Sequence, residues 1–403
     1  MSAGQHPNSG SAGPLEGVRV LDLTRILAGP TASQLLGDYG ADIIKVERPG
    51  VGDDTRSWGP PYVTGKDGKP TRESAYYLSA NRNKRSVAID IADPEGAAKV
   101  RRIAARCDVV MENFKLGGLK KYGLDYESLA AENPAIVYCS ITGFGQTGPN
   151  AHRPGYDLLA QGYGGIMSLT GDPDGEPMKV GVGIADIVCG LYGITAILAA
   201  LRHRDMTGRG QHIDVSLVDT QVSWLVNEGT NYLLSGTEPI RRGNQHPNIV
   251  PYQVFEAADG HVIVAAGNDG QYARFCGIIG MPELADDARF ATNPDRLAHR
   301  EDLIEILSAQ IRTLRKEDLV AGMEANNVPG GAINTIPEVF ESEQTRSRDM
   351  KITIPHPLAA SGEVDLIGNP VKFSHTPVTY RRPPPYCGEH TDEVLAELLG
   401  DDA

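Results

Sequence analysis

The first half of the chain alternates between short apolar runs and amphipathic stretches. The apolar runs lack polar alternation, which is typical of parallel strands buried on both faces of a sheet. The predicted strands are 18–23, 41–47, 86–91, 108–114, 135–144 and a segment that begins at 212. Helices are predicted between them at 30–40, 93–107 and 125–134. This order indicates an α/β fold with a doubly wound, mostly parallel, Rossmann-like sheet.

The pattern changes after about residue 225. One helix is predicted to continue to about 234. Residues 252–267 then alternate around Asp259–Gly260, which predicts a β-hairpin with those two residues in its turn. Helical periodicity follows at 300–314 and 316–327. We expect a disordered tail at 1–13, a large domain at 14–225 that residues 336–403 complete, and a smaller α+β domain at 226–335.

Two helix starts carry recognisable capping residues. Asp93 precedes Pro94, a combination that favours an N-cap followed by the first helical position. At the other end of the chain, Thr391 is predicted to cap a closing helix that runs to Leu399.

Composition and charge exclude several classes of protein. The chain has 403 residues, 40% of them hydrophobic, and a net charge of -14, which argues against nucleic acid or an anionic membrane as a partner. The longest uncharged apolar run, 187–201, is too short to span a bilayer. The five cysteines are scattered and no secretory leader is apparent at the N-terminus. We therefore expect a soluble, cytoplasmic protein.

A lone carboxylate, Asp186, lies among glycines and small apolar residues at the start of an uncharged helical stretch. A helix N-cap is the commoner role for such a residue. Gly181 and Gly183, however, would allow another molecule close to the backbone, and Gly190 and Gly193 would permit tight helix packing. A poorly hydrated carboxylate that a helix N-terminus keeps ionised has the character of a nucleophile. Free amides beside it would also stabilise an oxyanion. Asp186 is thus the predicted catalytic residue.

Other cofactor chemistry is not expected. Residues 181–186 resemble the beginning of a dinucleotide-binding turn, but Asp186 occupies the third glycine position and would oppose a pyrophosphate. No nicotinamide or flavin is therefore predicted. The histidines lack the spacing of metal ligands, so no metal is predicted.

Cations lie at the ends of successive predicted strands. They occur at Arg48, in 81–86, and at Lys115 and Lys121 beside Asn113. Open α/β sheets bind ligands at the carboxyl ends of their strands. Three such segments in an acidic chain predict a pocket for a long phosphorylated ligand, although a solvated loop is an equal alternative for 81–86.

Seven segments in order resemble the class III CoA-transferases, the formyl-CoA transferase or CaiB–BaiF type. They are 14–56, 81–96, 112–124, 140–149, 155–165, 183–194 and 207–217. Within that family, 53–63, 76–86 and 248–260 most resemble the succinyl-CoA:glutarate, or dicarboxylate, CoA-transferases. The resemblance implies transfer of CoA from an acyl-CoA, such as succinyl-CoA, to a free dicarboxylate. It also implies an interlocked homodimer, with Asp186 as the residue that forms anhydride and thioester intermediates.

The resemblance further implies a set of CoA contacts. These are Leu27, Ala28, Arg48, Ile89, Asp90, Ile91, Ala92, Asn113, Phe114, Lys115, Lys121 and Tyr156. A glycine-rich lid of the family falls on Gly243, Asn244 and Gln245, in a loop that is equally well interpreted as a linker. Formyl-CoA transferases carry His and Gln where this chain has Arg25 and Leu27, which argues against oxalate and formate as substrates.

The carboxylic acid should meet a cation. We expect Arg25, Arg82 or Arg85 to bind the distal carboxylate of a dicarboxylate. The alternative function within the family is a 2-methylacyl-CoA racemase. Racemases place a histidine where this chain has Tyr156, and without an imidazole a two-base proton exchange lacks one partner.

Overall fold

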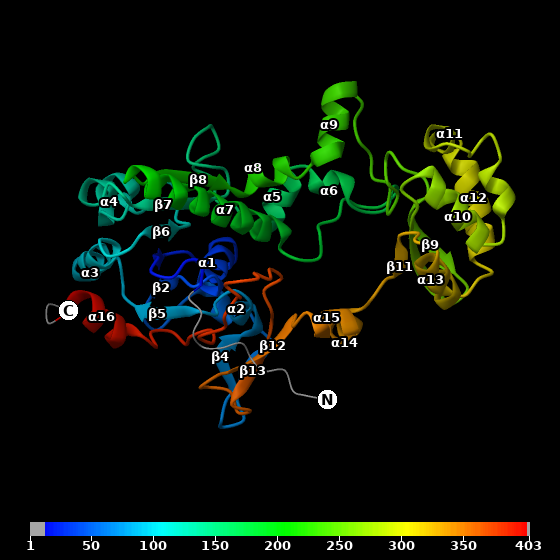
Figure 1. The fold of residues 1–403 in the computed structure, drawn as a ribbon. Helices are drawn as coiled ribbons and strands as arrows, with labels where there is room; N and C mark the ends of the chain where they lie inside the picture. Colours follow the sequence, from blue (N-terminus) through cyan, green and yellow to red (C-terminus); the bar gives the residue numbers. More distant parts are fainter. Residues whose placement is uncertain (1–12, 401–403) are drawn as a thin grey trace. The chain divides into compact units, whose positions relative to one another are not determined.

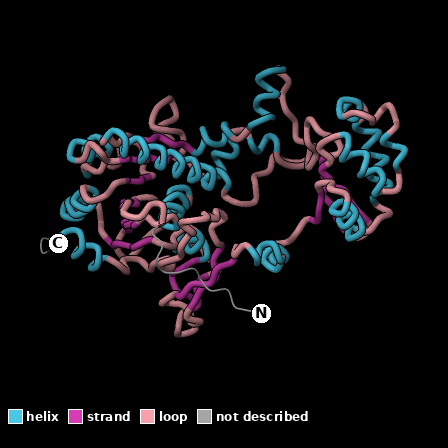
Figure 2. The backbone as a smooth tube through the Cα atoms, viewed as in Figure 1, coloured by secondary structure: helices cyan, strands magenta, loops and turns pink. Residues whose placement is uncertain are grey.

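The computed structural model describes residues 13–400, so the predicted tail at 1–13 lies almost wholly outside the described residues. The chain forms two compact units (Figures 1 and 2). Unit 1 comprises the chain up to Ile166, Lys179–Val226 and the chain from Glu343. Unit 2 comprises Met167–Met178 and Asn227–Ser342. Unit 2 thus differs from the predicted segment 226–335, because it includes a distant piece of chain and continues to Ser342.

Unit 1 is built around a six-stranded sheet in the order β5-β2-β1-β6-β7-β8, with every neighbouring pair parallel. The strands are β1 Arg19–Asp22, β2 Asp42–Glu47, β5 Lys84–Ala88, β6 Val109–Glu112, β7 Val137–Thr142 and β8 His212–Ser216. The order reverses between β1 and β6, and the crevice at such a reversal is where doubly wound sheets bind ligands. The predicted parallel α/β sheet is confirmed.

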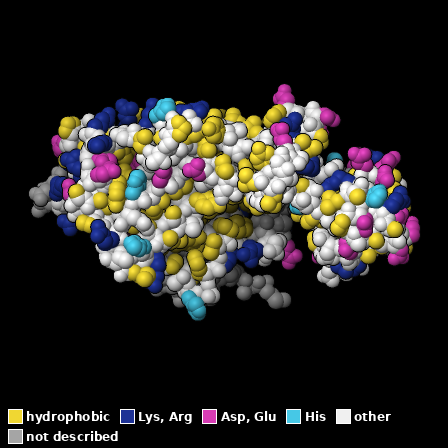
Figure 3. All heavy atoms as spheres, turned by 90° about the horizontal axis from the view of Figure 1, so that it is seen from above, with side chains coloured by type: hydrophobic (Ala, Val, Ile, Leu, Met, Phe, Trp, Pro, Cys, Tyr) yellow, Lys and Arg dark blue, Asp and Glu magenta, His cyan; other side chains and the backbone are white. Residues whose placement is uncertain are grey.

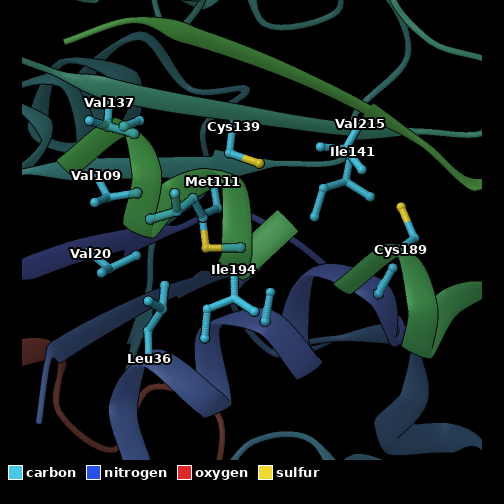
Figure 4. Close-up of a cluster of buried hydrophobic side chains, with 14 of the residues drawn as sticks. Val20, Leu36, Val109, Met111, Val137, Cys139, Ile141, Cys189, Ile194 and Val215 are labelled. Carbon is cyan, nitrogen blue, oxygen red and sulfur yellow. The ribbon is translucent and has the colours of Figure 1, made fainter. Parts of the chain in front are cut away.

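Helices cover both faces of this sheet. On one face lie α1 Ala28–Asp38, α5 Asp157–Tyr163, α7 Ile184–Thr207 and α8 Leu217–Ser223. On the other face lie α3 Pro94–Ala104, α4 Tyr126–Glu132 and α16 Thr391–Leu399. Figure 4 shows how Leu36 of α1 and Ile194 of α7 meet Val20 and Met111 of the sheet. The C-terminal helix therefore completes the core that the N-terminal half begins.

Helix α7 is long and apolar enough to cross a membrane by length and composition. The buried core helices of soluble proteins meet the same criterion, and half of its most apolar stretch is buried inside the protein. We therefore treat α7 as a core helix of unit 1.

The local predictions at helix ends differ in outcome. The Asp93 side chain accepts a hydrogen bond from the Gly96 amide, and Pro94 begins α3, as predicted. Thr391, in contrast, is the first residue of α16 rather than its N-cap. Its hydroxyl oxygen instead accepts a hydrogen bond from the Ala88 amide, 3.0 Å away, and ties α16 to the end of β5. The single helix predicted after β8 is interrupted before α9 Val226–Ser235, where Val226 has a φ of +43°.

Smaller elements complete unit 1. They are the hairpin of β3 Tyr62–Thr64 and β4 Pro70–Ser74, α2 Ala75–Ser79, α6 Ile166–Leu169, which runs into unit 2, α15 Glu343–Ser347, and the hairpin of β12 Lys351–Pro355 and β13 Glu363–Ile367.

Unit 2 contains a three-stranded antiparallel sheet and several helices around one apolar core. Its strands are β9 Tyr252–Ala257, β10 Gly260–Ala265 and β11 Gly330–Ala332, and its helices include α10 Asp269–Ile278, α11 Asn293–Ala298, α12 Arg300–Ile311, α13 Lys316–Ala325 and α14 Ile336–Glu341. The hairpin turn consists of Ala258 and Asp259. Gly260, which has a φ of +144°, already belongs to β10 and pairs with Ala257. The turn therefore lies one residue earlier in the chain than the predicted Asp259–Gly260.

Candidate active site

Two adjoining cavities open at the carboxyl ends of the sheet strands, and both are lined by unit 1 alone. The larger has a volume of about 650 Å³ and the smaller about 210 Å³. Of the predicted residues, the larger cavity is lined by Arg25, Ala28, Ile91, Asn113, Phe114, Lys115, Lys121, Tyr156 and Asp186. The smaller is lined by Arg25, Arg48, Ile89, Asp90, Ile91 and Phe114. Residues distant in sequence are thus brought to one edge of the sheet.

Two predicted contacts lie elsewhere. Leu27 lines neither cavity and occupies the position before α1. Ala92 also lines neither, and its amide donates a hydrogen bond to Asp90 in the turn after β5.

Asp186 is the third residue of α7 and is only 8% exposed. It is not an N-cap, since the helix begins after Gly183 and the Ala185 amide donates instead to Asp157 Oδ1, at 2.8 Å. Among the described residues, none donates a hydrogen bond to the Asp186 carboxylate. Asp186 therefore keeps its oxygen atoms available for a reacting partner.

The electrostatic surroundings of Asp186 differ from our expectation. Desolvation by burial, reinforced by the negative charge of Asp157, raises the pKa of Asp186 from its usual 3.8 to about 7. The Ala185 amide at the start of α7 donates to Asp157, so this N–H group does not stabilise the charge of Asp186. The site thus contains a carboxylate whose charged form is poorly stabilised, and such an oxygen gains by forming a covalent bond.

Close helix packing holds this carboxylate in place. A β-carbon at Gly190 of α7 would lie 2.6 Å from the carbonyl oxygen of Ala28, so only glycine permits this approach to α1. A β-carbon at Gly193 would make only ordinary van der Waals contacts, so the packing there does not require glycine. A β-carbon at Gly183 would lie 3.1 Å from Leu27, so that glycine accommodates the protein's own side chain, whereas Gly181 faces open space. The predicted tight packing is therefore confirmed at Gly190.

The prediction for Arg82 and Arg85 is wrong. The Arg82 guanidinium donates two hydrogen bonds to Asp38, at 2.9 and 2.6 Å, and is 3% exposed. Arg85 binds Asp42 at 2.6 Å and also the C-terminal helix through Glu397. Both arginines lie in or beside β5, line neither cavity, and are committed to joining segments of the fold. They are structural ion pairs rather than ligands for a substrate carboxylate.

Several cations remain in the larger cavity. Arg25 lies between the two cavities and pairs with Asp54 at 2.9 Å. Lys121 lies 4.6 Å from the centre of the Tyr122 ring. Arg153 lies over the ring of Phe144, and among the described residues no carboxylate pairs with it.

Sequence reasoning missed Asp157 and Arg153. Both lie close to Tyr156, for which we predicted a CoA contact and noted the missing racemase histidine. The available signals were an acid directly after Tyr156 and a cation three residues before it, and neither indicates a partner from another segment.

The predicted lid lies in unit 2. Gly243 has a φ of +57°, and its amide donates to the carbonyl of Gly171 in the other segment of that unit. Asn244 is exposed and Gln245 is half-buried. The role of this loop stays a prediction.

Known proteins share this architecture. The family model for CoA-transferase family III matches residues 15–391. A succinate–glutarate CoA-transferase of Agrobacterium fabrum is 52% identical over 96% of each chain, and a human succinyl-CoA:glutarate CoA-transferase is 44% identical over 96% of this chain and 86% of its own. The crystal structure of a CAIB/BAIF family protein from Brucella suis superposes with a TM-score of 0.84 at 49% identity, covering 96% of this chain and 100% of that one. The chain belongs to CoA-transferase family III.

Proposed function

We propose that this enzyme transfers CoA from succinyl-CoA to a short dicarboxylate of four to six carbons, such as glutarate. The observation that carries the proposal is Asp186, a buried carboxylate without a hydrogen-bond donor among the described residues, in the wall of a cavity large enough for an extended ligand. The substrate class is supported by the names of the relatives from Agrobacterium fabrum and human.

The reaction conserves the thioester free energy. An Asp186 oxygen attacks the acyl carbonyl, the carbon–sulfur bond breaks, and CoA leaves as a thiolate with a mixed anhydride on Asp186. The thiolate attacks the aspartyl carbonyl and expels the donor acid, which gives an aspartyl-CoA thioester. The acceptor carboxylate attacks this thioester and releases the thiolate again. The thiolate then attacks the acyl carbonyl of the second anhydride, which forms the product and restores Asp186.

The cavities suit CoA as a substrate. Lys115 and Lys121 offer ammonium groups to phosphates in the larger cavity, and Arg48 lies in the smaller one, where we place the adenine end. Asn113 contributes less directly than predicted, because its side-chain amide is already bound to the backbone of Arg25. Tyr156 is 61% exposed, lines the same cavity as Asp186 and is available to cover the acyl group.

Mass spectrometry tests the covalent relay. After incubation with succinyl-CoA, we expect a CoA thioester on the peptide that contains Asp186, and glutarate should discharge it as glutaryl-CoA. The reference is the same protein incubated with free CoA, which should remain unmodified. A protein that forms no adduct but exchanges deuterium from solvent into the α-carbon of a branched acyl-CoA would instead be a racemase.

We assign recognition of the distal carboxylate to Arg153 rather than to Arg25, because Asp54 already pairs with Arg25. Arg153→Gln keeps a planar group over Phe144 but loses the charge. We expect this change to raise the KM for glutarate about 10- to 100-fold, with little change for butyrate, because a charge-assisted hydrogen bond is lost. The matched control variant is Arg25→Gln, which removes the charge of the other arginine that lines the same cavity. The assignment is wrong if Arg25→Gln removes the preference for glutarate over butyrate and Arg153→Gln does not.

We also propose the assembly and location that the resemblance implies. A homodimer, expected to be interlocked, is supported by exposed apolar side chains of α7 and α8, such as Leu191, Tyr192 and Val222. Hydrophobic side chains also gather on the face of the protein seen in Figure 3. Sedimentation at twice the mass of one chain would test the dimer.

Unit 1 would be the CoA-binding domain and unit 2 the smaller domain. A cytoplasmic location agrees with the five free thiols and is tested by cell fractionation.

A further inference from the structure

The backbone of the segment Thr24–Ile26, between β1 and α1, is held by side chains at almost every polar group. The Thr24 amide donates to Asp22 at 2.9 Å, and the Thr24 carbonyl accepts from the Lys45 ammonium at 2.8 Å. The Ile26 amide donates to Asp53 at 3.3 Å. Lys45 and Asp53 also pair with each other at 2.9 Å.

The middle of the segment is held by Asn113, the residue that follows β6. The Arg25 amide donates to the side-chain oxygen of Asn113 at 3.0 Å, and the Asn113 amide donates back to the Arg25 carbonyl at 2.7 Å. Ile26 has a φ of +75°, in the left-handed region that β-branched residues rarely adopt. Such a conformation persists only where the surroundings determine it.

The charged residues that hold the segment are deeply buried. The side chains of Lys45 and Asp53 are 0% exposed, and so are those of Lys84 and Asp22 in the adjoining ion pair. Buried ion pairs gain little net stability, because desolvation of both charges opposes their attraction. A contribution to stability alone therefore does not account for this cluster. What the cluster does achieve is to fix the backbone conformation of Thr24–Ile26.

This backbone leads directly to the catalytic helix. A β-carbon at Gly183 would lie 3.1 Å from Leu27, and one at Gly190 would lie 2.6 Å from the carbonyl oxygen of Ala28. The backbone on either side of Asp186 therefore packs closely against this part of the chain. Ile26 and Ala28 also line the larger cavity. A shift of Ile26 would move the contacts that seat Asp186 against α1.

We propose that Lys45 and Asp53 are positioning residues that hold the backbone of Thr24–Ile26, with Ile26 in its left-handed conformation, and thereby set the position of Asp186. This inference rests on the proposed function of Asp186. Neither residue needs to touch the acyl group, because both act through the backbone of the segment.

Paired variants separate the hydrogen bond from the charges. Lys45→Met with Asp53→Leu removes both charges and the acceptor for the Ile26 amide, whereas Lys45→Met with Asp53→Asn removes the charges but keeps an acceptor. Lys45 and Asp53 also line the smaller cavity, so the adduct rate is measured at saturating succinyl-CoA, where weaker CoA binding no longer limits it. We expect the leucine variant to form the Asp186 adduct on the order of 10- to 100-fold more slowly per folded subunit, with partial recovery in the asparagine variant. A leucine variant that forms the adduct as fast as wild type, or no more slowly than the asparagine variant, would overturn the proposal.

Two further measurements keep this test decisive. Glu73→Gln alters another buried carboxylate, which binds Arg56 and does not contact Thr24–Ile26, so its adduct rate should stay within about twofold of wild type. Should the leucine variant not fold, hydrogen exchange on the wild-type protein replaces it. The Ile26 amide should be protected without ligand, and protection that appears only with CoA would refute the proposal. Absence of any wild-type adduct would contradict the proposed function itself and not the positioning.

Discussion

Asp186→Asn is expected to reduce CoA transfer by about 1000-fold or more, because the amide cannot supply the oxygen nucleophile on which every step depends. The side chain keeps its size in a site that is only 8% exposed, so the fold and the CoA cavity should be preserved. The measurements are the steady-state rate of glutaryl-CoA formation and the dissociation constant for CoA. We expect the rate to collapse while CoA binding stays within about threefold of wild type.

Two variants control for position and charge. Asp186→Glu retains the carboxylate but moves it by one methylene, and it should lose most activity because the reacting atoms are misplaced. Asp157→Asn removes the neighbouring negative charge and should retain the covalent adduct. Substantial transfer by Asp186→Asn, or an adduct on another residue, would show that Asp186 is not the nucleophile.

Asp186→Asn is also expected to stabilise the ligand-free protein at alkaline pH. The pKa of Asp186 is raised from its usual 3.8 to about 7 in the folded protein, so the folded state holds this proton more tightly than the unfolded chain does. Below 3.8 the proton is bound in both states and burial of the acid adds no pH-dependent cost. As the pH rises from 3.8 to about 7, the unfolded chain releases the proton first and the free energy of unfolding falls. The full cost, about 1–4 kcal/mol, then persists above pH 7.

Thermal unfolding at fixed protein concentration measures this effect. The difference in Tm between the variant and wild type should be small at pH 4 and should grow to several degrees at pH 8 in favour of the variant. Because both proteins share every other titrating group, the difference isolates residue 186. A difference that does not depend on pH, or one that favours wild type at pH 8, would show that burial does not penalise the Asp186 charge.

Together these results would describe a nucleophile maintained at the expense of stability. Proteins tolerate such residues where function requires them, and substitutions at catalytic positions often stabilise. Lower activity combined with higher stability in Asp186→Asn distinguishes a catalytic acid from a structural one, because loss of a structural carboxylate would lower both activity and stability.

The amino-acid pattern alone was sufficient to predict the fold class of unit 1, and it singled out Asp186, which the structure places in the wall of the larger cavity. Unbroken apolar runs separated by helical segments specify a buried parallel sheet, because both faces of each strand must be apolar. The glycines around Asp186 marked a place where backbones approach closely, and Gly190 does meet Ala28. Seven local segments were enough to indicate the family, which the match over residues 15–391 confirms.

The charged residues that face the cavity could be identified only in the folded chain. Arg82 and Arg85 belong to a cation-rich segment that looked suited to an acid, yet Asp38, Asp42 and Glu397 bind them inside the fold. Arg153 belongs to no recognisable motif. The fold shows that it lines the larger cavity without a carboxylate partner among the described residues.

This difference comes from the range of the interactions. Periodicity and capping act over a few residues and can be recognised along the chain, whereas an ion pair or a pKa depends on groups brought together from distant segments. The pKa of Asp186 is raised by burial in the folded protein and by Asp157, which belongs to a separate helix. Asp53 lies in the loop after another strand and accepts a hydrogen bond from the Ile26 amide. Local pattern was therefore enough to predict the sheet and to single out Asp186 as the proposed nucleophile, while the charge state and the position of Asp186 depend on contacts that exist only after folding.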